Sequence, residues 1–297
     1  MKAIIKHTDH IYYIKILPYE RLSSCSKDDK INIYNEKNYR LEQEINVGNG
    51  VVYLIILSND NIIACCFDGK MRIYELKNDG SKLIKELEGH NDIAIKVIKI
   101  KEKLISCSRD KTMEIWKKKE INDYNYMKSK IISDNSGINT NILQINENKL
   151  VSSATKSDYI KFFDIQNNFE EIKTIKNISV NCCLNSLEIF KENILLIGGS
   201  DTNGIYLIDT NNYQIISNFL QNFEIYSIIK LKNGKFLIGC KSNYYYSLIE
   251  FKYENNNLIK IKSKDKVHSN YITGLIEIKD EIIISCSCDC SIKFWME

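Results

Sequence analysis

Short apolar runs alternate with polar turns along the whole chain, in a pattern that repeats every 40 to 47 residues. Each copy begins with an apolar strand and continues through a turn to a second strand that ends in small residues. A tight polar turn follows, often with an aspartate, and leads to a third strand that ends in an aromatic or apolar residue. Runs of this length are typical of strands, and no amphipathic helix is needed. The pattern predicts an all-β protein built from a repeated unit.

The repeat is clearest in two segments that share most of their residue types. They read SCSRDKTMEIW at 106–116 and SCSCDCSIKFW at 285–295. The first four intervals between copies are 40, 42, 47 and 45 residues, and the last 87 residues divide into two similar ones. These periods match a four-stranded propeller blade and exceed a leucine-rich repeat. The copies end at Tyr34, Tyr74, Trp116, Phe163, Ile208, a position near 250, and Trp295.

The composition is that of a folded globular protein. The chain has 297 residues, of which 44% are hydrophobic, 27% charged and 10% aromatic, so it is long enough to bury a sizeable core. It contains one proline, Pro18, and no Gly/Ser-rich stretch or long block of charge at which to divide it. We therefore predict a single domain over residues 1–297, because closed all-β folds often reach this length as one unit.

Charge and targeting signals narrow the classes of partner and compartment. The chain carries 41 basic and 38 acidic residues, for a net charge of +3, with both signs interspersed. Nucleic acid calls for a basic face, so nucleic acid is not the expected partner unless the folded chain gathers a local basic patch. The first residues are too short an apolar run for a signal peptide, and no stretch reaches the ~18 apolar residues of a membrane span. We expect a cytoplasmic or nuclear protein with no membrane insertion.

Ten cysteines raise the question of disulfides or metal sites. Without a secretory signal the thiols are expected to stay reduced. Cys65-Cys66, Cys182-Cys183 and the run at 286–290 lack the Cys-x-x-Cys spacing of a zinc site. We predict packing roles, no bound metal and no cofactor, with metal or redox chemistry as the alternative. The cysteines that lie nine residues before the aromatic end of their copy, as a small packing residue would, are Cys25, Cys65, Cys107 and Cys286.

The best-formed copy begins with Gly89-His90-Asn91-Asp92 and ends at Trp116, and it resembles a repeat of the WD-repeat β-propeller family. The last copy is similar, with His268 in place and Lys266-Val267 where the usual glycine would lie. His7-Thr8-Asp9-His10 begins the first copy in the same register. The resemblance covers essentially the whole chain. It implies an all-β, seven-bladed β-propeller of four-stranded antiparallel blades.

The resemblance also implies a structural tetrad of a histidine, a strand serine, a turn aspartate and the strand-ending aromatic residue. A hydroxyl and a carboxylate satisfy both ring nitrogens of a buried histidine, and an indole N–H donates to the same hydroxyl. Because the set recurs and no nucleophile elbow surrounds the serines, we interpret it as structural rather than as a hydrolase triad. The sets are His7, Ser24, Asp28 and Tyr34; His90, Ser106, Asp110 and Trp116; and His268, Ser285, Asp289 and Trp295.

The other copies depart from this pattern. Copy two keeps Asp68 and Tyr74 but has Ala64 in place of the serine and Val47 near the histidine position. Copy four carries one extra residue and ends FFD at 162–164, and copies five and six keep the strand pattern without the histidine. Their assignment as blades rests on spacing and hydrophobicity.

The two ends of the chain predict how the propeller closes. The last copy stops one strand short, after Trp295, and residues 2–6 form a lone strand before His7. Comparable segments elsewhere serve as the outer strand of the preceding blade. We therefore expect the N-terminal strand to pair into the last blade, which closes the ring and removes exposed strand edges.

The resemblance implies a non-catalytic interaction scaffold or adaptor. In this family the top face commonly docks peptides or partner domains, through residues just after each histidine position and just before each turn aspartate. Loops on rigid scaffolds are also where binding residues concentrate. We predict a monomeric propeller that binds a partner protein within a larger multiprotein complex, and no catalytic residues. The docking positions carried over by register are His10, Tyr12, Lys27, Phe67, Arg109, Glu224, Tyr226 and Tyr271.

Several interpretations stay open. Several docking positions could instead cap strand ends or fill the central channel. Tyr244-Tyr245-Tyr246 is interpreted as strand packing, with one outward tyrosine able to add to an edge surface. The connection 117–126, which begins with three lysines, is interpreted as a solvated loop. The alternative function is recognition of a modified peptide or small ligand in the channel by Tyr12, Arg109, Glu224, Tyr226 and Tyr271.

Overall fold

The structure is a computed structural model of the chain. It describes residues 2–5, 7–58, 60–77, 80–120, 124–133, 137–155, 157–180, 186–199, 204–220, 223–242, 244–254, 257–278 and 282–295. Every regular element within these ranges is a β-strand, and none of them forms a helix that could cross a membrane. The prediction of an all-β fold is confirmed.

The strands form four-stranded antiparallel sheets that follow one another along the chain. They divide between two compact units, Met1–Asn135 with Ile278–Glu297 and Ser136–Glu277, and each unit is described by itself. The single domain over 1–297 stays a prediction. The three consecutive sheets of the first unit are β2 (Ile11–Leu17), β3 (Arg21–Ser26), β4 (Lys30–Asn35) and β5 (Leu41–Asn46); β6 (Val51–Ser58), β7 (Asn61–Cys66), β8 (Met71–Lys77) and β9 (Gly80–Leu87); and β10 (Ala94–Ile100), β11 (Lys103–Ser108), β12 (Thr112–Lys118) and β13 (Tyr126–Ser133).

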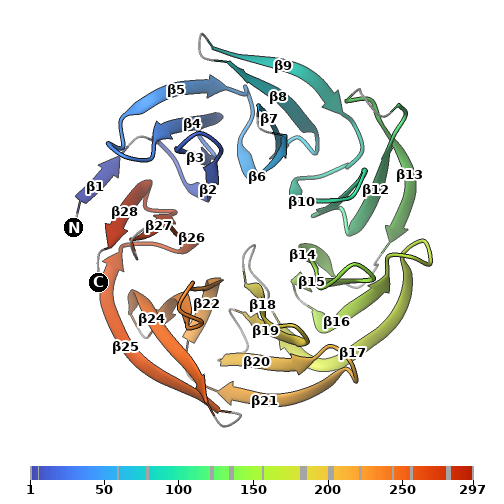
Figure 1. Ribbon diagram of the computed structural model, residues 1–297, viewed down its shortest axis with the longest axis vertical. Coiled ribbons are helices and arrows are strands. Elements are labelled where there is room, and N and C mark those ends of the chain that lie inside the picture. Colours follow the sequence, from blue (N-terminus) through green and yellow to red (C-terminus); the bar gives the residue numbers. More distant parts are fainter. Residues whose placement is uncertain are drawn as a thin grey trace. The chain divides into compact units, whose positions relative to one another are not determined.

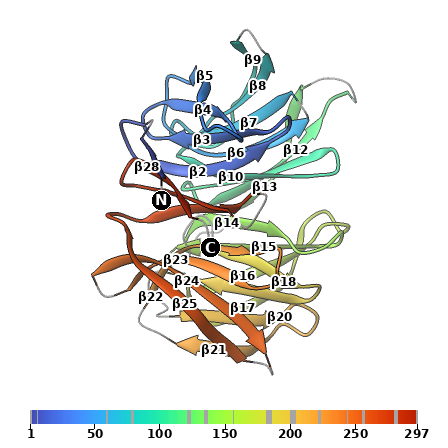
Figure 2. The same cartoon turned by 60° about the vertical axis from the view of Figure 1, so that its left-hand side comes forward.

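The sheets of the first unit pack against one another through their apolar faces. β2, β6 and β10 lie side by side, and β5, β9 and β13 are the outer strands of their sheets (Figures 1 and 2). Ile33 of the first sheet and Leu54 of the second belong to one buried apolar cluster, and Ile73 of the second sheet and Trp116 of the third belong to another. Burial of these apolar faces removes them from water and holds neighbouring sheets together.

The second unit repeats this arrangement. Phe190, Phe236 and Phe251 pack in the core shared by its second and third sheets. Its three consecutive sheets are β14 (Ile138–Gln144), β15 (Lys149–Thr155), β16 (Ser157–Asp164) and β17 (Glu170–Val180); β18 (Leu187–Lys191), β19 (Ile194–Gly198), β20 (Gly204–Asp209) and β21 (Gln214–Leu220); and β22 (Phe223–Lys230), β23 (Phe236–Ser242), β24 (Tyr245–Glu254) and β25 (Asn257–His268).

The remaining sheet takes strands from both ends of the chain. Its order is β1 (Lys2–Ile5), β28 (Ser291–Trp295), β27 (Ile283–Ser287) and β26 (Ile272–Glu277). β1 pairs antiparallel with β28, with Lys2 opposite Phe294 and Ile5 opposite Ser291. The N-terminal strand therefore pairs with the last strand of the chain. Lys6, which was also assigned to this strand, lies outside the described residues.

The repeat is visible in the hydrogen-bond register of the sheets. In each of the six sheets between β2 and β25, a β-bulge interrupts the pairing of the third and fourth strands immediately before the residue that ends the copy. A bulge at a constant position increases the local strand twist in the same way in every sheet. This register places the end of copy six at Phe251, within the range expected near 250. The six end residues are Tyr34, Tyr74, Trp116, Phe163, Ile208 and Phe251.

Candidate functional site

The histidine network of the third copy joins all four residues of its predicted tetrad. His90 Nδ1 lies 3.0 Å from Asp110 and 3.1 Å from the Thr112 hydroxyl, and its Nε2 lies 2.8 Å from Ser106 Oγ. The Trp116 indole N–H donates to the same hydroxyl at 2.9 Å. Burial disfavours the charge of Asp110, but hydrogen bonds from His90, Thr112 and a backbone N–H outweigh it and lower the pKa of this carboxyl. The network ties the segment before β10 to β11 and β12.

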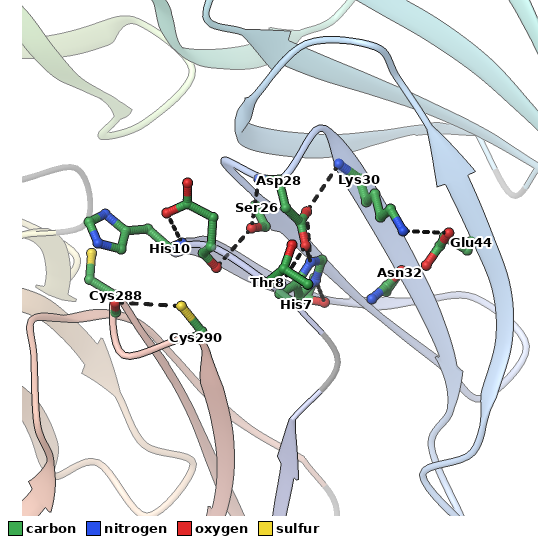
Figure 3. Close-up of polar contacts among 12 residues, drawn as sticks. His7, Thr8, His10, Ser26, Asp28, Lys30, Asn32, Glu44, Cys288 and Cys290 are labelled. Atoms are coloured by element: carbon green, nitrogen blue, oxygen red, sulfur yellow. Dashed lines mark hydrogen bonds and ion pairs between the residues drawn. The ribbon is translucent and has the colours of Figure 1, made fainter.

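The first copy forms the same network, but the contact between its serine and its strand-ending aromatic residue is weaker. His7 Nδ1 lies 2.9 Å from Asp28, and its Nε2 lies 2.7 Å from Ser24 Oγ (Figure 3). The Ser24 hydroxyl reaches the Tyr34 hydroxyl only at 3.5 Å, and Asn32 donates to Tyr34 at 3.2 Å. Tyrosine in place of tryptophan therefore keeps the contact but needs an additional partner.

Burial of His7 makes the stability of the protein depend on pH. Desolvation lowers the pKa of His7 below its usual 6.5, although Asp28 opposes this shift. Between the two pKa values the unfolded chain binds more protons, so the free energy of unfolding falls as the pH drops below about 6.5. The stability that neutral, buried His7 contributes is fully present above that pH. It is lost as the pH falls through the folded pKa, at up to roughly 1.4 kcal/mol per pH unit.

This dependence can be measured by urea denaturation of the wild type and of His7→Asn between pH 7.5 and pH 5. We expect the wild type to lose stability across this range and the variant, which lacks the imidazole, to show a shallower slope. Equal slopes for both proteins would show that His7 does not carry the dependence.

The seventh copy links its serine and tryptophan in the same way. The Trp295 indole N–H donates to Ser285 Oγ at 2.8 Å, and Asp289 accepts from the backbone N–H and the hydroxyl of Ser291 at 3.0 and 2.5 Å. His268 is 5% exposed and belongs to the other unit. The serines of the three copies, which would be the nucleophiles of a hydrolase triad, are fully buried: Ser24, Ser106 and Ser285.

The second copy replaces the tetrad with an ion-pair network that sequence reasoning missed. Arg72 lies opposite Ala64 in the β7–β8 ladder, so the small residue leaves room for its side chain. Its two Nη atoms donate to the two carboxylate oxygens of Asp68 at 3.1 and 2.6 Å, and its Nε donates to Glu86 at 2.7 Å. The Arg72 side chain is 9% exposed. The turn aspartate therefore keeps a partner after the histidine is lost.

Three of the predicted docking residues of the first unit form a row of rings. The ring centroids of His10 and Tyr12 are 6.3 Å apart, and those of Tyr12 and Phe67 are 5.7 Å apart. Tyr12 occupies the bulge at the start of β2, and burial raises its pKa to about 12. His10 points toward Cys288 (Figure 3). The row combines His10 directly before β2, Tyr12 within β2, and Phe67 in the turn after β7.

Lys27, Phe67 and Arg109 occupy one position of the repeat. The backbone N–H of each donates to the residue before the first strand of its sheet, at 2.9, 2.9 and 3.1 Å. Lys27 also lies 3.7 Å from Asp9. Arg109 is exposed and forms no ion pair within the part of the chain that the structure describes. Its guanidinium is therefore open to solvent.

The predicted docking residues of the second unit form a compact cluster. The ring centroids of Tyr226 and Tyr271 are 4.5 Å apart with the ring planes tilted by 39°, and Tyr246 meets Tyr271 edge-on at 5.6 Å. Glu224 accepts a hydrogen bond from the Tyr226 hydroxyl and pairs with Lys241 at 3.1 Å. Sequence reasoning missed Lys241, which lies opposite Glu224 in the β22–β23 ladder, because copy six lacks the turn aspartate that marks this position.

The described cysteines have the environment expected of packing residues. All eight are free thiols, and seven are buried. Burial raises the pKa of Cys66, Cys107 and Cys240 to about 12, which disfavours the reactive thiolate. No group of three or more metal-ligating side chains occurs within the described ranges. Cys182 and Cys183 lie outside them.

The lysine run at 117–119 is partly strand, contrary to its interpretation as a loop. β12 continues through Lys118, and Lys117 and Lys118 pair with Met127 and Tyr126 of β13. Asn122 and Asp123, in the middle of this connection, lie outside the described residues.

Comparison with known proteins identifies the repeat and the fold. The family model "WD domain, G-beta repeat" matches residues 81–117 and 261–296. No curated protein matches the chain in sequence. A chain of the solved structure "Crystal Structure of Mitotic Checkpoint Complex" is similar with a TM-score of 0.79 and 13% identity, over 97% of this chain and 89% of that one. The chain therefore carries WD repeats at 81–117 and 261–296 and has the fold of a seven-bladed β-propeller.

Proposed function

We propose that this protein is a non-catalytic scaffold that docks a partner protein at the strand ends where the aromatic clusters lie. The WD-repeat propeller fold and the likeness to a chain from a multiprotein complex support a protein-interaction scaffold. Propellers of this type are generally non-catalytic, and the buried serines of the tetrads agree with this. The docking surface itself is our proposal.

The observation that carries the proposal is the chemistry of the two clusters. The row of His10, Tyr12 and Phe67 in the first unit and the stack of Tyr226 on Tyr271 in the second place aromatic rings at strand ends. Tyrosine and arginine are enriched among residues that dominate binding energy. Tyrosine in addition buries much area at a low cost in conformational entropy. Exposed Arg109 adds a charge in the first unit.

Affinity capture with crosslinking tests this proposal. We expect Arg109→Glu combined with Tyr271→Ala to lose the specific partners of the wild type while its melting curve stays unchanged. The matched control is Arg40→Glu combined with Tyr19→Ala, since both residues are exposed and lie in strand connections at the other end of the first sheet. The docking surface would be wrong if the first variant retained the partner set of the wild type, or if the control lost it equally.

A further inference from the structure

The hairpin between β23 and β24 is longer than the corresponding hairpins of other copies. Leu22 pairs with Tyr34, and Leu104 with Trp116, each twelve residues further on. In copy six, Phe236 pairs with Phe251, fifteen residues further on. Copy six therefore carries three additional residues in this hairpin, which contains Tyr244, Tyr245 and Tyr246.

The hairpin tyrosines are largely exposed rather than packed. Tyr244 is 91% exposed and Tyr245 is 43% exposed, and Tyr271 beside them is 41% exposed. Tyr246 is half-buried and holds its edge against the Tyr271 ring. The earlier interpretation as strand packing therefore applies only to Tyr246. An insertion that adds exposed aromatic surface next to an existing ring stack indicates an interaction surface.

The base of this surface is held by contacts within the chain. Tyr226 is 8% exposed and stacks on Tyr271, and its hydroxyl is held by Glu224. Lys241 pairs with the same carboxylate at 3.1 Å, so the Lys241 and Glu224 charges compensate one another. A partner therefore meets a preorganised aromatic platform and gains affinity because little ordering remains to be done.

One positive charge at the edge of the platform has no compensating carboxylate. Lys266 Nζ lies 4.6 Å from the centroid of the Tyr245 ring, and no described carboxylate forms an ion pair with it. Its backbone has φ of 57°, the left-handed region that costs a lysine roughly 1 kcal/mol. The bulge in the β24–β25 ladder opposite Ser247 creates this conformation.

We propose that this tyrosine patch, made of Tyr244, Tyr245, Tyr246, Tyr271 and Lys266, binds an acidic peptide segment in which aspartate or glutamate flanks an aromatic or aliphatic residue. The proposal rests on the proposed docking function and names the chemistry of one partner. Charge complementarity with Lys266 decides the sign of the partner's charge. A cationic partner would be repelled by Lys266 and would compete with it for the Tyr245 face, whereas a carboxylate can pair with Lys266 while an apolar residue covers the tyrosines.

Selection from a phage-displayed library of random twelve-residue peptides tests the patch. The baits are the wild type, Tyr244→Ser combined with Lys266→Asn, and the control Tyr19→Ser combined with Lys37→Asn. Asparagine tolerates the left-handed backbone, so the first variant keeps its fold. The control removes a tyrosine that is 64% exposed and a lysine side chain that is 71% exposed. We expect acidic peptides with an aromatic or aliphatic residue to be enriched on the wild type and the control but not on the patch variant.

Binding of the enriched peptides by fluorescence anisotropy gives the size of the effect. We expect Lys266→Asn to raise Kd about 3- to 5-fold, Lys266→Arg to restore it, and the double variant to raise it about 10- to 30-fold. Neutral or basic enriched peptides, or none above background, would overturn the acidic partner. Peptides that bind the wild type and the patch variant equally would also overturn it while leaving the docking function in place, because the other aromatic cluster is unchanged in both.

Discussion

Removal of residues 1–6 is expected to lower the melting temperature by roughly 6–12 °C. β1 pairs with β28 through four consecutive residue pairs, from Lys2 opposite Phe294 to Ile5 opposite Ser291. Loss of this ladder costs about 3–4 kcal/mol, at about 1 kcal/mol for each hydrogen bond. It also leaves β28 as an unpaired edge. An open edge is a template for pairing with another chain, so the truncated protein should self-associate more readily.

Differential scanning calorimetry and light scattering measure the two effects. The control replaces residues 2–5 with an alternating Thr-Val sequence, which keeps a strand that can pair but changes its side chains. We expect this replacement to recover most of the lost stability, since the pairing depends on the backbone. An unchanged melting temperature after truncation would contradict the role of β1 in completing the last sheet.

The tetrads could be predicted because their spacing follows from strand geometry. His90 and Asp110 must meet across β10 and β11, and Trp116 must return to Ser106 from the next strand. Each hydrogen bond therefore demands a constant separation along the chain. This geometry explains why histidine and aspartate are separated by 21 residues in copy one and by 20 residues in copy three.

The partners that replace a lost tetrad could not be predicted in the same way. In copy two, the sequence shows only that the serine and the histidine are missing. Arg72 reaches Asp68 because Ala64 lies opposite it in the ladder, and this depends on the register of two strands. The tyrosine patch was predicted only in part, as one outward tyrosine at an edge surface, for a related reason. Three added residues in the copy-six hairpin shift the residues of β24 relative to those of β23, so the positions of the repeat no longer align after the hairpin.

Replacement of Arg72 by leucine is expected to destabilise the protein by about 2–3 kcal/mol. The Arg72 side chain is 9% exposed, whereas its partners Asp68 and Glu86 are 25% and 34% exposed. Breaking a fully buried ion pair costs 3–5 kcal/mol, and partial exposure of both carboxylates reduces this because water can solvate them. Leucine fills part of the space, so the loss comes mainly from the two carboxylates left without their guanidinium.

The same substitution should also change the response to acid. Burial opposes the charge of Asp68, but its hydrogen bonds with Arg72 and the Lys70 backbone outweigh this and lower its pKa. A lowered carboxyl pKa contributes stability that is present above the unfolded value near 3.9 and is lost as the pH falls through the folded value. Without Arg72 the pKa of Asp68 rises, so Arg72→Leu should lose less stability than the wild type between pH 5 and pH 3.

A double-mutant cycle separates the ion pair from the packing of the side chain. Urea denaturation of Arg72→Leu, Asp68→Asn and the double variant should give a coupling energy of about 1–3 kcal/mol, because each single change removes the same bidentate contact. Arg72→Lys should fall between wild type and Arg72→Leu, since an ammonium group cannot form the planar fork. Arg109→Leu, at an exposed arginine, is the matched control and should change stability by less than about 0.5 kcal/mol. Additive single effects would mean that Arg72 stabilises copy two by filling space, and that Asp68 no longer needs a cationic partner where the tetrad histidine is missing.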